Sequence, residues 1–110
     1  FPYTTLFRSR AAAVNLMSTV PEVTYRAALA AIVSFNRLEN LPRITLPVLC
    51  LACDEDKTAP AAVMEKMASK IPQGHYQCLA QAGHLGNMEQ PDAFNTAVLA
   101  FLQQHFPSKE

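Results

Sequence analysis

One stretch of six residues constrains the fold more than any other part of this 110-residue sequence. Val48–Cys53 (VLCLAC) is an unbroken apolar run between Pro47 and an acidic segment. Six residues suit a strand better than a helix. A strand that is apolar on both faces is typical of the centre of a parallel sheet covered by helices on each side. The run therefore predicts a buried parallel strand.

Three helix patterns and a second strand accompany this run. A helix is predicted over residues 21–35, because proline suits the first helical position and apolar residues then recur at helical spacing. A second helix is predicted over residues 60–71, and a third begins at Pro91. The second strand is predicted at residues 75–80. Helix, strand, helix, strand and helix in this order imply right-handed crossovers and an α/β fold with a parallel sheet.

Composition argues against several classes of protein. Half of the residues are hydrophobic and 16% are charged, which is typical of a globular chain. Nine basic residues balance nine acidic ones, and no basic stripe points to nucleic acid or to an anionic membrane. No apolar run approaches the roughly 18 residues needed to cross a bilayer. We therefore expect a cytoplasmic protein that binds neither nucleic acid nor membrane.

Cys50 and Cys53 form a C-x-x-C, a spacing that also occurs in zinc and redox sites. In a strand, however, this odd spacing places the two side chains on opposite faces of the sheet. Cysteine is also among the residues most often buried. With Cys78, the three cysteines are too few for a disulfide scaffold. We therefore expect core residues here, and no metal or cofactor.

Two loops directly follow the predicted strands, at the sheet edge where catalytic groups collect in open α/β sheets. The first (CDEDKTAP) carries Asp54, Glu55 and Asp56, and the second (AGHLGNMEQP) carries His84. A carboxylate beside a histidine fixes the imidazole tautomer and stabilises the imidazolium that forms when the ring takes a proton. The two loops therefore predict an acid–histidine pair. Asp56 is the preferred acid because of its spacing to the threonine and proline that follow, and Asp54 is the fallback.

Other polar residues near these loops have simpler roles. Glu89 is expected to be structural, holding the loop or the start of the last helix through its carboxylate. Gly83 permits a close backbone approach beside His84. His75 opens a strand and His105 ends a helix, so neither is expected to belong to the site.

From Leu46 onward these segments resemble the C-terminal end of the α/β-hydrolase family. The strand and loop that present the triad acid, written G-x-x-D followed by T-x-P, are similar to LPVLCLACDEDKTAP. The histidine loop and final helix are similar to AGHLGNMEQPDAFNTAVLAFL. Asp56 then matches the acid and His84 the histidine, whereas Cys53 stands where the pattern has glycine. Within the family, the pattern G-H-L-x-N-x-E-Q-P-x-x-F-N most resembles the 3-oxoadipate enol-lactonases and related esterases.

The resemblance implies an incomplete α/β-hydrolase fold in three regions. Residues 46–110 correspond to the C-terminal part of the core. Residues 10–45 fit the end of the lid region and the helix that connects it to the core. Residues 1–9 (FPYTTLFRS) resemble translated sequencing-adapter sequence and predict a non-native leader. We therefore expect the chain to be a C-terminal fragment of a longer protein.

The resemblance also implies a hydrolase that cleaves small-molecule esters or lactones through a Ser–Asp–His triad. The family's serine lies in a G-x-S-x-G elbow before the acid. Glycine occurs only as Gly74, Gly83 and Gly86, so no serine has glycines two positions away on both sides. We therefore expect this chain to lack the nucleophile and to be inactive by itself. Two alternatives stay open: an aspartate nucleophile, as in haloalkane dehalogenases, and a non-catalytic ligand-binding protein on the same fold.

Overall fold

The computed structural model describes residues 3–107, and the side-chain exposure of residues 10–107. The predicted non-native leader, residues 1–9, therefore lies outside the residues whose side chains are described. The chain divides into two compact units, Phe1–Arg37 and Leu38–Glu110. Within the described chain, no helix is both long and apolar enough to cross a bilayer.

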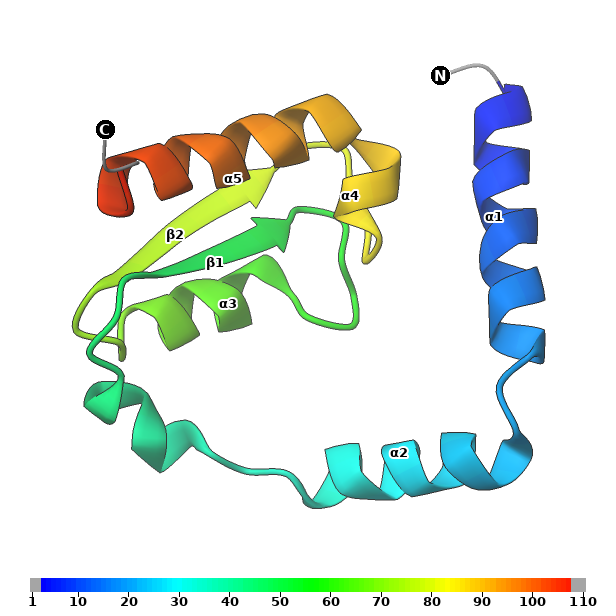
Figure 1. Ribbon diagram of the computed structural model, residues 1–110, viewed down its shortest axis with the longest axis horizontal. Coiled ribbons are helices and arrows are strands. Elements are labelled where there is room, and N and C mark those ends of the chain that lie inside the picture. Colours follow the sequence, from blue (N-terminus) through cyan, green and yellow to red (C-terminus); the bar gives the residue numbers. More distant parts are fainter. Residues whose placement is uncertain (1–2, 108–110) are drawn as a thin grey trace. The chain divides into compact units, whose positions relative to one another are not determined.

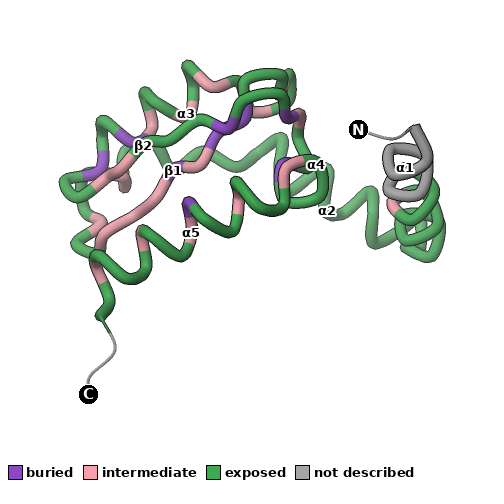
Figure 2. Tube along the Cα trace, turned by 90° about the horizontal axis from the view of Figure 1, so that it is seen from above, coloured by how far each residue is buried: buried purple, intermediate pink, exposed green. Residues whose placement is uncertain are grey.

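The first unit contains two helices, α1 (Tyr3–Ser18) and α2 (Glu22–Ser34) (Figure 1). The helix predicted over residues 21–35 is confirmed as α2, whereas α1 has no counterpart in the sequence pattern. Figure 2 shows α2 exposed along its whole length. The four residues of its predicted apolar face are 44–87% exposed in the described structure: Tyr25, Leu29, Ile32 and Val33.

The second unit holds two strands between two helices (Figure 1). Its elements, in chain order, are η1 (Leu38–Arg43), β1 (Val48–Cys53), α3 (Ala61–Ala68), β2 (Gly74–Leu79), α4 (Gly86–Glu89) and α5 (Pro91–His105). α3 and α5 lie on opposite faces of the two strands in both ribbon and tube views (Figures 1 and 2). The predicted order of helix, strand, helix, strand and helix is confirmed; the 3₁₀ helix η1 and the four-residue helix α4 are additions to it.

β1 and β2 pair in parallel, with Val48 opposite Gly74 and Cys53 opposite Leu79. The bounds of β1 match the prediction, because a run that is apolar on both faces has sharp ends. The helix predicted over residues 60–71 is shorter in the structure, since α3 ends at Ala68. Ile71 lies in the turn that follows and is still buried, at 5% exposure. Its apolar spacing therefore marks a core position rather than a helical one.

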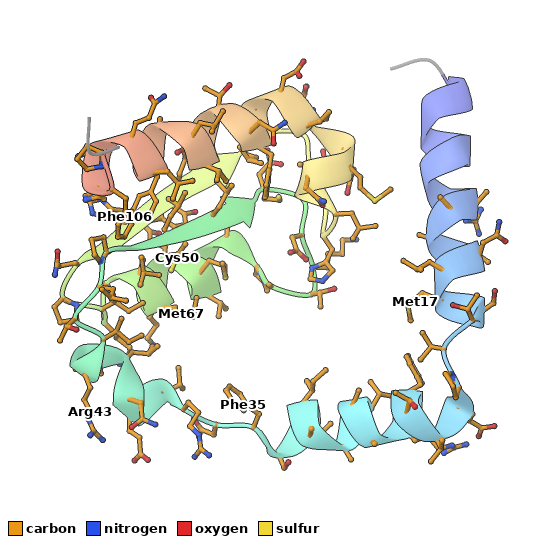
Figure 3. All side chains as sticks on the ribbon, in the orientation of Figure 1. Met17, Phe35, Arg43, Cys50, Met67 and Phe106 are labelled. Atoms are coloured by element: carbon orange, nitrogen blue, oxygen red, sulfur yellow. The ribbon has the colours of Figure 1, made fainter. Side chains whose placement is uncertain are left out.

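The buried core lies along β1 and has two sides. Cys50 belongs to the cluster against α3, on which Met67 also packs (Figure 3). Cys53 belongs to the other cluster, with Leu79, where Phe94 of α5 packs. The predicted placement of the C-x-x-C cysteines on opposite faces is confirmed, and both thiols are free. Burial raises the pKa of both thiols, which keeps them in the less reactive protonated form.

Candidate active site

The candidate site is formed by two loops, the acid loop (residues 54–60) and the histidine loop (residues 80–90). The last residues of β1 and β2 are partners in the sheet register, so the two loops begin side by side. The N–H of Glu55 donates to the carbonyl of Ala82 at 3.0 Å. Oδ1 of Asp54 accepts a hydrogen bond from the N–H of Ala82 at 3.3 Å. Asp54, the fallback acid, thus joins the two loops and does not contact the histidine ring.

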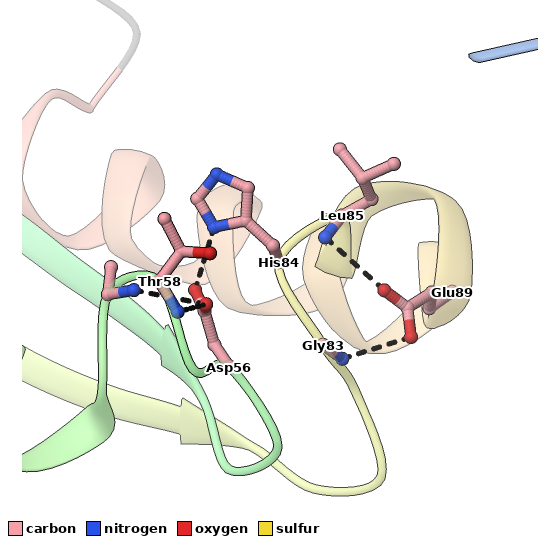
Figure 4. A network of polar contacts seen from close by, with 7 residues as sticks. Asp56, Thr58, Gly83, His84, Leu85 and Glu89 are labelled. Carbon is pink, nitrogen blue, oxygen red and sulfur yellow. Dashed lines mark hydrogen bonds and ion pairs between the residues drawn. The ribbon is translucent and has the colours of Figure 1, made fainter. Parts of the chain in front are cut away.

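Asp56 and His84 face each other across the two loops (Figure 4). Nδ1 of His84 lies 2.9 Å from Oδ2 of Asp56. Because an ionised carboxylate can only accept, Nδ1 carries the hydrogen, and Nε2 of the neutral ring is left as an acceptor that points away from Asp56. The side chain of Asp56 is 8% exposed and that of His84 is 59% exposed. The acid is therefore shielded from solvent while the histidine ring is open to a reaction partner.

The second oxygen of Asp56 is held within its own loop. Oδ1 accepts hydrogen bonds from the N–H of Thr58 at 2.8 Å and of Ala59 at 3.0 Å. The hydrogen bond with His84, together with these two, holds the pKa of Asp56 below its ordinary value. Asp56 is therefore ionised at neutral pH, the form that orients an imidazole and stabilises an imidazolium.

Glu89 contacts the main chain on both sides of His84 (Figure 4). Oε2 of Glu89 accepts from the N–H of Gly83 at 3.0 Å, and Oε1 accepts from the N–H of Leu85 at 3.2 Å. The prediction that this carboxylate holds the histidine loop is confirmed. Glu89 is also the last residue of α4, so the short helix and the loop are parts of one structure.

A cavity of about 220 Å³ lies beside the pair at the carboxyl end of β1. Its lining is mainly apolar and consists of Leu51, Ala52, Cys53, Asp56, Ala59, Met64, His84, Gly86, Asn87 and Phe94. Cys53, which stands where the hydrolase pattern has glycine, leaves no room for a side chain at position 86. A Cβ placed on Gly86 would lie 2.5 Å from Sγ of Cys53.

Sequence reasoning missed several residues of this site. The turn that holds Asp56 has a signal that could have found it, because an aspartate often binds the main-chain N–H two residues ahead. Met64, Asn87 and Phe94 line the cavity but have no such signal. Two of them are apolar residues on helix faces, where the spacing indicates only core packing.

The remaining candidate groups make contacts of their own. His75 is the second residue of β2, at the end opposite the histidine loop, and the centroid of its ring lies 4.4 Å from that of His105. The serine side chains within the described chain each donate to a carbonyl of the preceding turn: Ser18, Ser34 and Ser69. No cluster of three or more His, Cys, Asp or Glu residues suited to a metal ion occurs among the described residues.

No protein-family model matches the chain. BpoC of Mycobacterium tuberculosis, named as a non-heme bromoperoxidase, is 39% identical over 66 residues, which are 60% of this chain and 25% of BpoC. RutD of Caulobacter sp. strain K31, named as a carbamate hydrolase, is 32% identical over 77 residues, which are 70% of this chain and 29% of RutD.

Solved structures agree with these matches. An esterase from Thermogutta terrifontis superimposes with a TM-score of 0.60 and 36% identity, over 62% of this chain and 25% of the esterase. The structure of BpoC superimposes with a TM-score of 0.62 and 35% identity, over 64% of this chain and 26% of BpoC. The chain thus spans about a quarter of the length of BpoC and of RutD.

Proposed function

We propose that this chain, which has the fold of the C-terminal part of an α/β-hydrolase, supplies the acid and the histidine of a hydrolase that cleaves small-molecule ester or lactone bonds. The observation that carries the proposal is the 2.9 Å contact between Nδ1 of His84 and Oδ2 of Asp56 beside a cavity. Relatives named as an esterase and a carbamate hydrolase support a hydrolytic reaction. The cytoplasmic location expected from the sequence is part of the same proposal.

Each group has a distinct task in this reaction. Nε2 of His84 takes the proton of a serine hydroxyl as its oxygen attacks the carbonyl carbon, and returns that proton to the leaving group as the acyl-serine forms. A water molecule then attacks the acyl-serine, with His84 taking the proton of the water and returning it to the serine oxygen. Asp56 keeps the hydrogen on Nδ1 and stabilises the imidazolium. The mechanism requires no metal or cofactor. No serine in the sequence lies in a G-x-S-x-G elbow, so the chain by itself is expected to be inactive.

A chimera tests this proposal. Residues 46–107 of this chain replace the matching segment of the Thermogutta terrifontis esterase, whose own nucleophile is retained. The chimera should hydrolyse a p-nitrophenyl ester. His84→Ala should lower kcat by about 10⁶-fold and Asp56→Asn by about 10⁴-fold, as the corresponding triad substitutions do.

Two matched substitutions serve as controls in the same chimera. His75→Ala removes a histidine outside the site, and Asp54→Asn keeps a side-chain oxygen that can accept from Ala82; both should leave kcat within a few-fold. If Asp54→Asn abolishes turnover and Asp56→Asn does not, Asp54 is the acid. A folded chimera whose turnover is unaffected by His84→Ala would overturn the proposal. A folded chimera without these substitutions that binds the ester but does not hydrolyse it would favour the non-catalytic alternative.

A further inference from the structure

Glu89 meets the two main-chain groups that flank His84. The N–H of Gly83 and the N–H of Leu85 donate to different oxygens of one carboxylate, at 3.0 and 3.2 Å. Hydrogen bonds to an ionised acceptor are about twice as strong as those between neutral groups. A carboxylate with two oxygens can accept both bonds at once, whereas a side-chain amide has only one acceptor oxygen.

The space at Gly83 is matched to this contact. A Cβ placed on Gly83 would lie 3.2 and 3.4 Å from the two carboxylate oxygens of Glu89. The absence of a side chain at position 83 therefore lets the carboxylate come within hydrogen-bond distance of the loop. A main-chain hydrogen bond also joins these residues, because the N–H of Glu89 donates to the carbonyl of Leu85 at 3.0 Å.

His84 needs such support because packing does not hold its ring. Its side chain is 59% exposed, whereas that of Asp56 is 8% exposed. The N–H of Leu85 belongs to the peptide plane that follows His84, so the bond to Glu89 sets the rotation of the main chain at that residue. The direction in which the ring leaves the loop depends on that rotation, as does its reach to Asp56.

We propose that Glu89 is a positioning residue, which orients His84 toward Asp56 by holding the main chain on both sides of the histidine. The proposal rests on the proposed function only in that the reaction uses His84. The contribution of Glu89 is geometric and does not depend on a nucleophile. Removing the Glu89 carboxylate should therefore change which nitrogen of the His84 ring carries the hydrogen, even where no reaction takes place.

The test is NMR spectroscopy of the full chain labelled with ¹⁵N, compared with Glu89→Gln. The ring nitrogens of His84 report which of them carries the hydrogen, and amide exchange reports the hydrogen bonds of Gly83 and Leu85. In the parent, Nδ1 should carry the hydrogen. In Glu89→Gln, the two amides should exchange about 10-fold faster, as for the loss of one charge-assisted bond, and the Nδ1-protonated form should fall by a similar factor relative to the other tautomer.

Glu55→Gln is the matched control, because it removes one carboxylate from the acid loop and leaves the hydrogen bonds of Glu89 with Gly83 and Leu85 intact. It should leave both readouts unchanged. If Glu89→Gln does not fold, Gly83→Ala repeats the test by displacing the carboxylate without removing its charge. Faster amide exchange with an unchanged His84 ring would overturn the positioning role and leave Glu89 a purely structural residue. Neither readout depends on turnover, so failure here is distinct from failure of the chimera.

Discussion

The acid loop and the histidine loop reach their shared geometry by different means. Asp56 is held by N–H groups two and three positions ahead in its own loop, at 2.8 and 3.0 Å. The main chain around His84 is held by two carboxylates. That of Asp54 accepts from the N–H of Ala82, and that of Glu89 accepts from the N–H groups of Gly83 and Leu85. The histidine loop also contains Gln81, which at 56° has the one positive φ among non-glycine residues of the described chain.

The loop that is less firmly held by its own residues is the one more sensitive to substitution. A shielded carboxylate can be fixed by a local turn, because one of its oxygens accepts hydrogen bonds from two N–H groups of the same loop. An exposed histidine has few packing contacts, so its orientation depends on hydrogen bonds that come from several places along the chain. Substitutions in the histidine loop should therefore have larger and more coupled effects than those in the acid loop.

The largest expected effect is where the histidine loop meets the last residue of β1. Gly86→Ala should lower the free energy of unfolding by about 1–3 kcal/mol, because its Cβ would meet Sγ of Cys53 at 2.5 Å. Glu55→Ala, at an exposed position of the acid loop, should change it by less than about 0.5 kcal/mol. Urea denaturation at neutral pH measures both. In a Cys53→Ala background the cost of Gly86→Ala should largely disappear, since the two residues are coupled. An equal cost in both backgrounds would rule out this contact as the cause.

A smaller effect on the free energy of unfolding should appear at low pH. Its size shows how strongly Asp56 is held in the folded chain. The pKa of Asp56 is lowered in the folded chain, first by His84 and then by the N–H groups of its own loop. Its contribution to stability is therefore fully present above the unfolded value of about 4, and is lost as the pH falls through the folded value. Denaturation curves between pH 6 and pH 2 should show this loss, and Asp56→Asn should remove it.

His84→Ala separates the two sources of that stabilisation. It should raise the pKa of Asp56 without restoring its ordinary value, because the N–H groups of Thr58 and Ala59 still donate to the carboxylate. The ¹³C shift of the Asp56 carboxyl group measures this directly during a pH titration. A return to the ordinary pKa would mean that the acid loop depends on the histidine loop as well, and the contrast between the loops would fail.

The smallest expected effect compares backbone strain in the two loops. Gln81→Gly should stabilise the chain by up to about 1 kcal/mol, because a left-handed conformation costs about that much for a residue with a Cβ. Lys57→Gly, at an acid-loop position without positive φ, should destabilise it by up to about 1 kcal/mol through added flexibility of the unfolded chain. Thermal unfolding of the two variants should thus shift in opposite directions. Shifts of the same sign would show that strain at Gln81 is not a distinguishing feature of the histidine loop.

Much of the second unit could be predicted from the sequence for identifiable reasons. β1 has no polar residue on either face, and this pattern predicts a buried parallel strand over Val48–Cys53. The meeting of Asp56 and His84 could be predicted because neighbouring parallel strands end at one edge of the sheet. α4 could not, since four residues contain no helical repeat.

Other features depend on contacts that have no sequence pattern. The approach of Cys53 to Gly86 joins a strand end to a short helix in a different loop, and nothing in either segment indicates it. α1 escaped prediction because its first residues show no apolar period. The apolar spacing of α2 correctly predicts a helix, but periodicity alone does not show what covers its apolar face.

The most direct test of the acid–histidine pair is to locate the hydrogen on the His84 ring. A long-range ¹H–¹⁵N correlation spectrum of the full chain at neutral pH identifies the nitrogen that carries it. The 2.9 Å contact with ionised Asp56 predicts that Nδ1 is protonated, that Asp56→Asn removes this preference, and that Asp54→Asn preserves it. A neutral ring with its hydrogen on Nε2, or a preference that survives Asp56→Asn, would contradict the account.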